Sequence, residues 1–158
     1  MLKSASNTLP RRNFIPRCQS MKKVNINFYK PRNTSQMMYR HLLEDRDNPI
    51  LFVSGPTGTS KTFGATLVGL EKLYKGEVEK LVLTRPAKSE STKNLFLPFV
   101  DSLRTILTQS EVDHLFSNDR IEICSLCHTR ERTFRNSFVI VDECQNTTSS
   151  QMLVLLTR

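Results

Sequence analysis

A chain of 158 residues with 38% hydrophobic and 24% charged residues has the composition of one ordinary globular domain. Its longest apolar runs fall far short of the ~20 residues of a membrane-spanning helix, and its four cysteines are too few for a disulfide scaffold. The net charge of +8 is unevenly placed, because residues 1–47 hold ten Lys/Arg against three Asp/Glu.

The basic N-terminal segment is expected to be an arm attached to a globular domain at residues 24–158. Residues 1–23 contain six Lys/Arg and no acidic residue. Such an arm suits binding to nucleic acid or another polyanion, and a solvated tail is the alternative.

The elements ahead of the central motif are short. Residues 24–29 alternate apolar and polar side chains, which predicts a strand or extended lead-in. Thr34 or Ser35 is expected to cap a helix running to about Leu43. Gln36 in that helix is either a reader of an adenine edge, since a side-chain amide both donates and accepts, or a plain surface glutamine.

The central motif is ILFVSGPTGTSKT at residues 50–62. A predicted strand at residues 50–53, a glycine loop and a helix that ends near Gly76 form the pattern of a phosphate-binding P-loop, or Walker A motif. Backbone N–H groups would face phosphate oxygens, Lys61 would supply charge to the β- and γ-phosphates, and Thr62 would ligate Mg²⁺. The predicted nucleotide-binding residues are Gly55, Pro56, Thr57, Gly58, Thr59, Ser60, Lys61 and Thr62.

Ser60 departs from the motif, which has glycine before the lysine. A Cβ at this position either crowds the phosphates or is harmless, if Ser60 already has the φ of a first helical turn.

Strands and helices alternate through the rest of the chain. Strands are predicted at residues 78–84, 121–126 and 138–141, and helices at residues 98–107, from a capping box of Ser110 and Asp113 to Phe116, and from Thr148 to Leu156. This alternation predicts an α/β fold with a parallel sheet covered by helices on both faces.

The apolar run at residues 138–141 is followed at once by Asp142 and Glu143, the pattern of a Walker B motif. A buried strand would deliver Asp142 at its carboxyl end to hold Mg²⁺, usually through water. Glu143 would orient or deprotonate the attacking water, so the pair favours hydrolysis over transfer to a substrate. Lys61 and Glu143 are therefore the predicted catalytic residues.

The loop before that strand contains Arg130, Arg132 and Arg135. An arginine here could act as an arginine finger or contact nucleic-acid phosphates, and a solvated basic loop is as good an account.

Cys124, Cys127 and His128 match a haem-attachment pattern, which we reject. No apolar export signal is present and no second CxxC pair exists for zinc, so we expect buried, reduced cysteines in a cytoplasmic compartment.

Taken together, the sequence resembles the PhoH-like ATPase family, and in particular its shorter, virus-type members. The resemblance runs from about residue 24 to the end and rests on GPTGTSKT (55–62), LTRP (83–86), FLP (96–98), RERTF (130–134), FVIVDECQNTT (138–148), QM (151–152) and LTR (156–158), with a lead-in of Pro31, Asn33, Gln36 and Tyr39. Three departures stand out: Ser60 and Glu131 replace family glycines, and the family continues through at least one more strand past Arg158. We therefore expect a truncated member.

This resemblance implies a RecA-like P-loop core that binds ATP and Mg²⁺ and hydrolyses ATP. It also implies helicase-like action on nucleic acid, RNA more than DNA, and in some members a homo-oligomeric ring, with no membrane partner. The alternatives are a non-hydrolysing fragment that binds nucleotide or nucleic acid, and a P-loop phosphotransferase.

Overall fold

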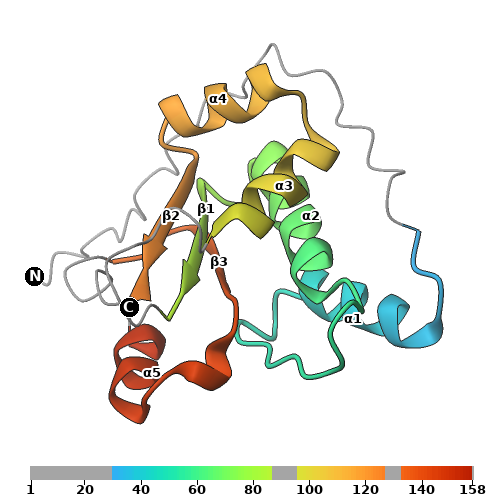
Figure 1. The fold of residues 1–158 in the computed structure, drawn as a ribbon, viewed down its shortest axis with the longest axis vertical. Helices are drawn as coiled ribbons and strands as arrows, with labels where there is room; N and C mark the ends of the chain where they lie inside the picture. The colour runs from blue at the N-terminus through green and yellow to red at the C-terminus, as the bar shows by residue number, and fades with distance from the viewer. Residues whose placement is uncertain (1–29, 87–95, 127–132, 158) are drawn as a thin grey trace, which may run out of the picture.

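The computed structural model describes residues 30–86, 96–126 and 133–157 (Figure 1). Its elements are α1 (Thr34–Glu44), α2 (Lys61–Tyr74), β1 (Lys80–Arg85), α3 (Leu97–Ile106), α4 (Gln109–Ser117), β2 (Ile121–Ser125), β3 (Ser137–Val141), the 3₁₀ turn η4 (Cys144–Asn146) and α5 (Ser149–Leu156). In the view of Figure 1, α1, α2 and α3 stand to the right of the strands, α4 lies above them and α5 below. None of the helices in the described ranges is long and apolar enough to cross a membrane.

The three strands form one parallel sheet in the order β2-β1-β3. In the middle strand Leu81 is paired with Ile121 of β2 on one side and with Phe138 of β3 on the other. Four successive residues of β1, at positions 81–84, are fully buried, as expected for a parallel strand covered on both faces. The predicted parallel α/β fold is confirmed.

Helix α2 packs directly on this sheet through its glycine at position 69. A Cβ on Gly69 would lie 2.6 Å from Leu81 Cδ1 and 2.9 Å from Phe138 Cδ1, closer than packed atoms can approach. The absence of a side chain there lets the helix lie against β1 and β3. Since α2 starts at Lys61, this packing also sets the position of the P-loop relative to the ends of the strands.

Helix α1 is attached to α2 by an ion pair and a hydrogen bond. Glu71, only 4% exposed, accepts two hydrogen bonds from Arg40 Nη2 at 2.9 and 3.0 Å. A buried carboxylate needs such a partner, because its desolvation is otherwise costly. The Tyr39 hydroxyl donates to the Lys61 carbonyl at 2.8 Å, so α1 contacts the first turn of α2 as well.

The N-cap of α5 is the predicted residue, whereas the N-caps of α4 and α1 are not. Thr148 caps α5 as predicted, in a capping box with Gln151. Helix α4 begins slightly ahead of the prediction, because Thr108 and Glu111 form its capping box in place of Ser110 and Asp113. For α1 the N-cap is Asn33, whose Oδ1 accepts from the Gln36 N–H, so the prediction of Thr34 or Ser35 was wrong by one or two positions. Several short polar residues in a row leave a cap ambiguous within a turn.

The predicted strand at residues 50–53 is not formed. Ile50 is 55% exposed, Phe52 69% and Val53 39%, and the segment joins no sheet among the described residues. An apolar run becomes a strand only when a neighbouring strand accepts its backbone hydrogen bonds, so strand propensity alone was insufficient here. The predicted lead-in at residues 24–29 lies outside the described residues.

Candidate functional site

The P-loop, residues 55–62, folds over the side chain of its own lysine. Lys61 Nζ donates to the carbonyl oxygens of Gly55 and Pro56, both at 2.8 Å, and lies 3.4 Å from Thr59 Oγ1. The Thr59 hydroxyl in turn donates to the Pro56 carbonyl at 2.9 Å. The ammonium group therefore lies within the curve of the loop, where its charge would meet an anion bound by the loop.

Ser60 precedes α2 in the left-handed backbone region, with φ 65° and ψ 27°. Gly58 has φ 81° in the same loop. For an L-residue with a Cβ this region costs about 1–2 kcal/mol, which is the physical reason for a glycine at position 60 in the motif. Of the two alternatives for Ser60, the harmless helical φ was therefore wrong. The serine is strained, and its side chain makes no capping hydrogen bond to α2 in return.

Helix α2 begins at Lys61, so the predicted order of loop and helix is confirmed. The first amide groups of a helix lack partners within the helix, and together with the helix dipole they favour a bound anion. The loop thus presents a positive helix end and an ammonium group to the same place.

Thr62 and Asp142 connect the P-loop to the far strand. Helix α2 carries Thr62 in its first turn, and Asp142 follows the last residue of β3; the Thr62 hydroxyl donates to Asp142 Oδ1 at 3.0 Å. In an octahedral Mg²⁺ shell with bonds of ~2.1 Å, neighbouring ligand oxygens lie about 3 Å apart. The two predicted metal-binding groups therefore lie close enough to hold one ion, with Asp142 bound to it directly or through a water molecule.

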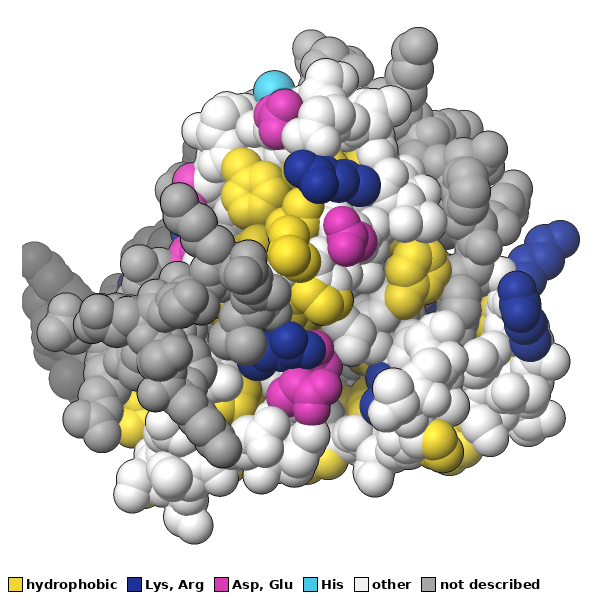
Figure 2. Space-filling view, in the orientation of Figure 1, with side chains coloured by type: hydrophobic (Ala, Val, Ile, Leu, Met, Phe, Trp, Pro, Cys, Tyr) yellow, Lys and Arg dark blue, Asp and Glu magenta, His cyan; other side chains and the backbone are white. Residues whose placement is uncertain are grey.

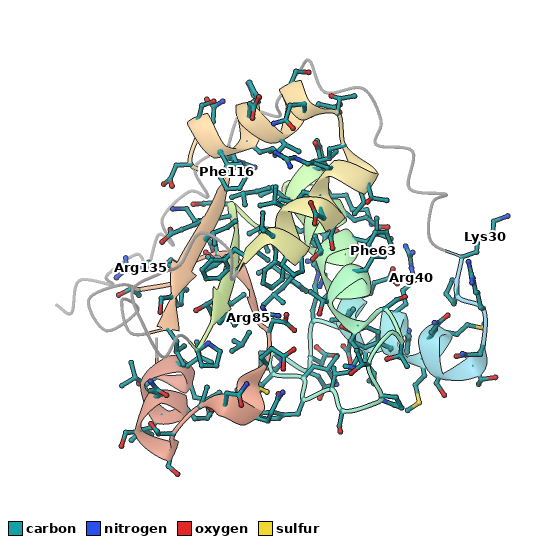
Figure 3. All side chains as sticks on the ribbon, in the orientation of Figure 1. Lys30, Arg40, Phe63, Arg85, Phe116 and Arg135 are labelled. Atoms are coloured by element: carbon teal, nitrogen blue, oxygen red, sulfur yellow. The ribbon has the colours of Figure 1, made fainter. Side chains whose placement is uncertain are left out.

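Arg85 is a component of this site that the sequence interpretation missed. It ends β1, and its Nη2 lies 2.6 Å from Asp142 Oδ2 and 3.7 Å from Glu143 Oε1. Figure 3 labels Arg85 at the lower end of the sheet, where β3 runs into η4. Figure 2 shows Lys/Arg and Asp/Glu side chains in contact near the middle of the same face. A basic residue at the carboxyl end of a strand was the available signal, because parallel neighbours end at one edge.

Glu143 lies beside the acidic ligand but faces outward. Its side chain is 46% exposed and accepts a hydrogen bond from Gln145 Nε2. Its backbone, with φ 56°, is also in the left-handed region. Strained residues of this kind persist where the surrounding structure holds them, and functional sites are a common place for them. The role of Glu143 as a base stays a prediction.

Gln36 is one turn from Tyr39 on α1, the helix that contacts the start of α2. Its Oε1 accepts from the Arg32 N–H at 2.8 Å, so in this structure the amide oxygen binds the backbone just ahead of α1. Positions three apart on a helix share a face, which places Gln36 on the side of α1 that carries Tyr39 to Lys61. The adenine-reading role of Gln36 stays a prediction.

The arginine loop is largely beyond the described residues. Arg130 and Arg132 lie outside them, as do Cys127 and His128, and Cys124 is buried in β2. Arg135 is exposed and lines a cleft of about 720 Å³ together with Lys80 and Ser137, the first residues of β1 and β3. That cleft lies at the amino ends of the strands, whereas Asp142 and Arg85 lie at their carboxyl ends. Arg135 (labelled in Figure 3) is therefore separate from the P-loop site.

Comparison with known proteins gives a consistent result. Residues 29–158 match the model of a family described as PhoH-like protein. The chain is 35% identical over 136 residues to a PhoH-like protein of Synechocystis, which covers 78% of this chain and 41% of the relative. It is 36% identical over 124 residues to one of Bacillus subtilis (70% and 39%) and 30% identical over 142 residues to Protein PhoH of Escherichia coli K12 (80% and 40%). The chain thus spans about 40% of the length of these relatives.

Proposed function

Because this chain belongs to the PhoH-like protein family, we propose that it binds ATP with Mg²⁺ and hydrolyses it, as part of a helicase-like action on RNA or other nucleic acid. The observation that supports this most is the hydrogen bond between Thr62 and Asp142. It brings a hydroxyl at the start of the P-loop helix and the carboxylate that follows strand β3 to one point, although β3 is only partly buried and not the fully buried strand that was predicted. These are the two kinds of oxygen ligand that nucleotide-bound Mg²⁺ takes from P-loop proteins.

The residues of the loop would bind the phosphates. Backbone N–H groups of residues 55–62 would face the phosphate oxygens, and Lys61 would exchange its bonds to the Gly55 and Pro56 carbonyls for the β- and γ-phosphates. A Mg²⁺ ion bound there neutralises charge that develops on the phosphates. Thr62 and Asp142 would hold the ion, and Gln36 would offer an amide to the adenine edge.

Glu143 favours hydrolysis over transfer to another substrate. Its carboxylate follows Asp142 directly and is exposed, so it is open to water and can orient a water molecule or take its proton. An enzyme that transfers phosphate to a substrate has to exclude water from this place. A P-loop phosphotransferase is therefore the less favoured alternative.

A second candidate function is nucleotide binding without turnover, and the conformation of Ser60 favours it. A Cβ in the left-handed region at this position adds strain next to the phosphates. The chain also spans only about 40% of the length of its relatives, so turnover by those longer proteins does not by itself extend to this chain. Measurements of ATP affinity and of the hydrolysis rate distinguish the two functions. Both predict ATP binding, and only the first predicts Mg²⁺-dependent release of phosphate.

The proposal of a nucleic-acid partner is based on the positive charge of the chain. The net charge is +8, and residues 1–23 carry six basic and no acidic side chains. RNA is the proposed partner ahead of DNA. The proposed roles of Arg130 and Arg132, as an arginine finger or as nucleic-acid contacts, and the homo-oligomeric ring also stay proposals.

The test of the main proposal measures ATP affinity by fluorescence titration and phosphate release with and without single-stranded RNA. Affinity and turnover that both depend on Mg²⁺ support the proposal. Affinity without turnover supports the binding-only alternative, and no affinity for ATP contradicts both.

A further inference from the structure

Arg85 already provides a positive charge at the place where the proposed metal ion would bind. Its guanidinium lies 2.6 Å from Asp142 Oδ2, with 15% of the arginine side chain and 18% of the aspartate side chain exposed. The same nitrogen is 3.7 Å from Glu143 Oε1. A single arginine thus contacts both carboxylates that follow β3, and its pair with Asp142 is largely shielded from solvent, which strengthens the attraction.

The backbone sets this pairing. Strands β1 and β3 are hydrogen-bonded neighbours in which Thr84 pairs with Val141, and the Asp142 N–H donates to the Thr84 carbonyl at 3.0 Å. Arg85 and Asp142 follow these paired positions on the two strands. The charged groups are therefore held together by the register of the sheet, whatever ligand the loop holds.

Other ion pairs in the described residues do not involve the P-loop site. Arg40 binds Glu71 where α1 meets α2, and Lys80 binds Asp119 and Glu122 near the amino ends of the strands. Asp142 differs from these carboxylates because one of its oxygens accepts from Thr62 and the other pairs with Arg85. A metal ion that binds Asp142 therefore finds a carboxylate that already pairs with the positively charged side chain of Arg85.

We propose that Arg85 is a positioning residue that competes with Mg²⁺ for Asp142, which rests on the proposed function. Without the ion, the guanidinium balances the charge of Asp142 and keeps the Asp142 carboxylate turned toward the end of β1. When the ion binds, the guanidinium gives up its bond to Asp142, because two cations on one carboxylate repel each other in a site of low dielectric constant. Arg85 thereby sets the Mg²⁺ concentration at which the site takes up metal.

The test measures Mn²⁺ alone, in place of Mg²⁺, by the loss of the free-ion signal in electron paramagnetic resonance, with no nucleotide present. Arg85→Met removes the charge and keeps an unbranched side chain, and it should bind Mn²⁺ about tenfold more tightly than the wild type, since one charge-assisted hydrogen bond no longer has to be broken. Arg85→Lys keeps the charge on a compact ammonium group without the planar fork of the guanidinium. Its Mn²⁺ affinity should lie between those of the wild type and Arg85→Met.

Two further variants locate the effect. Arg46→Met removes an arginine from the exposed ion pair with Glu77, which does not involve the P-loop site, and should leave Mn²⁺ affinity unchanged. Asp142→Asn, added to Arg85→Met, should abolish the gain, because the competition is for Asp142.

The proposal is overturned if folded Arg85→Met binds Mn²⁺ no better than the wild type, or if the gain survives Asp142→Asn. Should Arg85→Met fail to fold, by circular dichroism, Arg85→Lys and Arg85→Gln decide in the same way. Failure of the proposed function has a different signature, since a wild type that binds Mn²⁺ but no ATP contradicts ATP binding and leaves the competition at Asp142 measurable.

Discussion

The side chains of Thr62 and Asp142 are 80 positions apart in the chain and 3.0 Å apart in the structure. Thr62 lies in the first turn of α2, and Asp142 follows the last residue of β3, the strand next to β1. The metal-dependent part of nucleotide binding should depend on this pair.

Asp142→Asn should therefore weaken Mg²⁺-dependent ATP binding and leave metal-free binding nearly unchanged. The amide keeps the shape of the carboxylate but loses its charge, which a divalent ion requires. ATP titrations in Mg²⁺ and in a chelator check this. Asp113→Asn, on the exposed surface of α4, is the control and should change neither titration. Equal losses with and without metal would show that Asp142 acts on the fold and not on the ion.

Lys61→Ala should abolish measurable ATP binding without unfolding the protein. The ammonium group bonds only to loop atoms among its described partners, so its removal takes away phosphate charge and little core packing. Each charge-assisted hydrogen bond to phosphate that is removed should cost about 1.5–3 kcal/mol of binding, or at least about tenfold in affinity. Fluorescence titration measures the ATP affinity, and thermal denaturation measures the stability of the fold. The control is Lys75→Ala, at the other end of α2, which should bind ATP normally. A Lys61→Ala protein with wild-type ATP affinity would contradict the P-loop assignment.

Ser60→Gly should tighten ATP binding or raise turnover, and should also stabilise the protein. Relief of the left-handed strain is worth about 1–2 kcal/mol, and the greater freedom of glycine in the unfolded chain offsets about 0.5–1 kcal/mol of it. Urea denaturation and ATP titration check the two effects. At Ser54 the φ angle is not positive, so Ser54→Gly should give no gain in stability. Weaker ATP binding by Ser60→Gly would show that the serine is an adaptation of the loop.

Glu143→Gln should keep ATP bound and slow hydrolysis by roughly 10²-fold, the usual scale for the loss of a general base. The glutamine has the same length, so the left-handed backbone and the exposed position of the side chain are retained. Phosphate release under saturating ATP measures the hydrolysis rate, and ATP titration measures the affinity. The comparison is with Asp142→Asn: if both changes lower affinity equally, the roles of the two residues are assigned wrongly.

Removal of residues 1–23 should lower nucleic-acid affinity and its salt dependence while ATP affinity stays the same. The segment contains six Lys/Arg and no acid, and each basic side chain that no longer neutralises a phosphate reduces the slope of log K against log salt by roughly 0.7–0.9. If about half of the six charges engage, the slope changes by about 2 to 3. RNA and DNA binding of both chains at several salt concentrations measures this. Identical slopes would make the arm a solvated tail.

The sequence by itself determined the local elements and their order. Helical periodicity, the glycine loop with Lys61 and the cap at Thr148 are short-range patterns, and the helices that they predicted, α2 and α5, are present. The alternation of strands and helices was enough for a parallel sheet, because parallel neighbours need a crossover between them. The position of Asp142 at a strand end followed from the same local signals.

Only the tertiary structure decided the features that depend on partners distant in sequence. The apolar segment at residues 50–53 is not a strand, since a strand forms only where another backbone pairs with it. The sign of φ at Ser60 follows from how the loop meets α2, which residue type alone does not set. The ion pair of Arg85 with Asp142 required the register of β1 and β3, because the two residues are 57 positions apart and only the sheet brings them together.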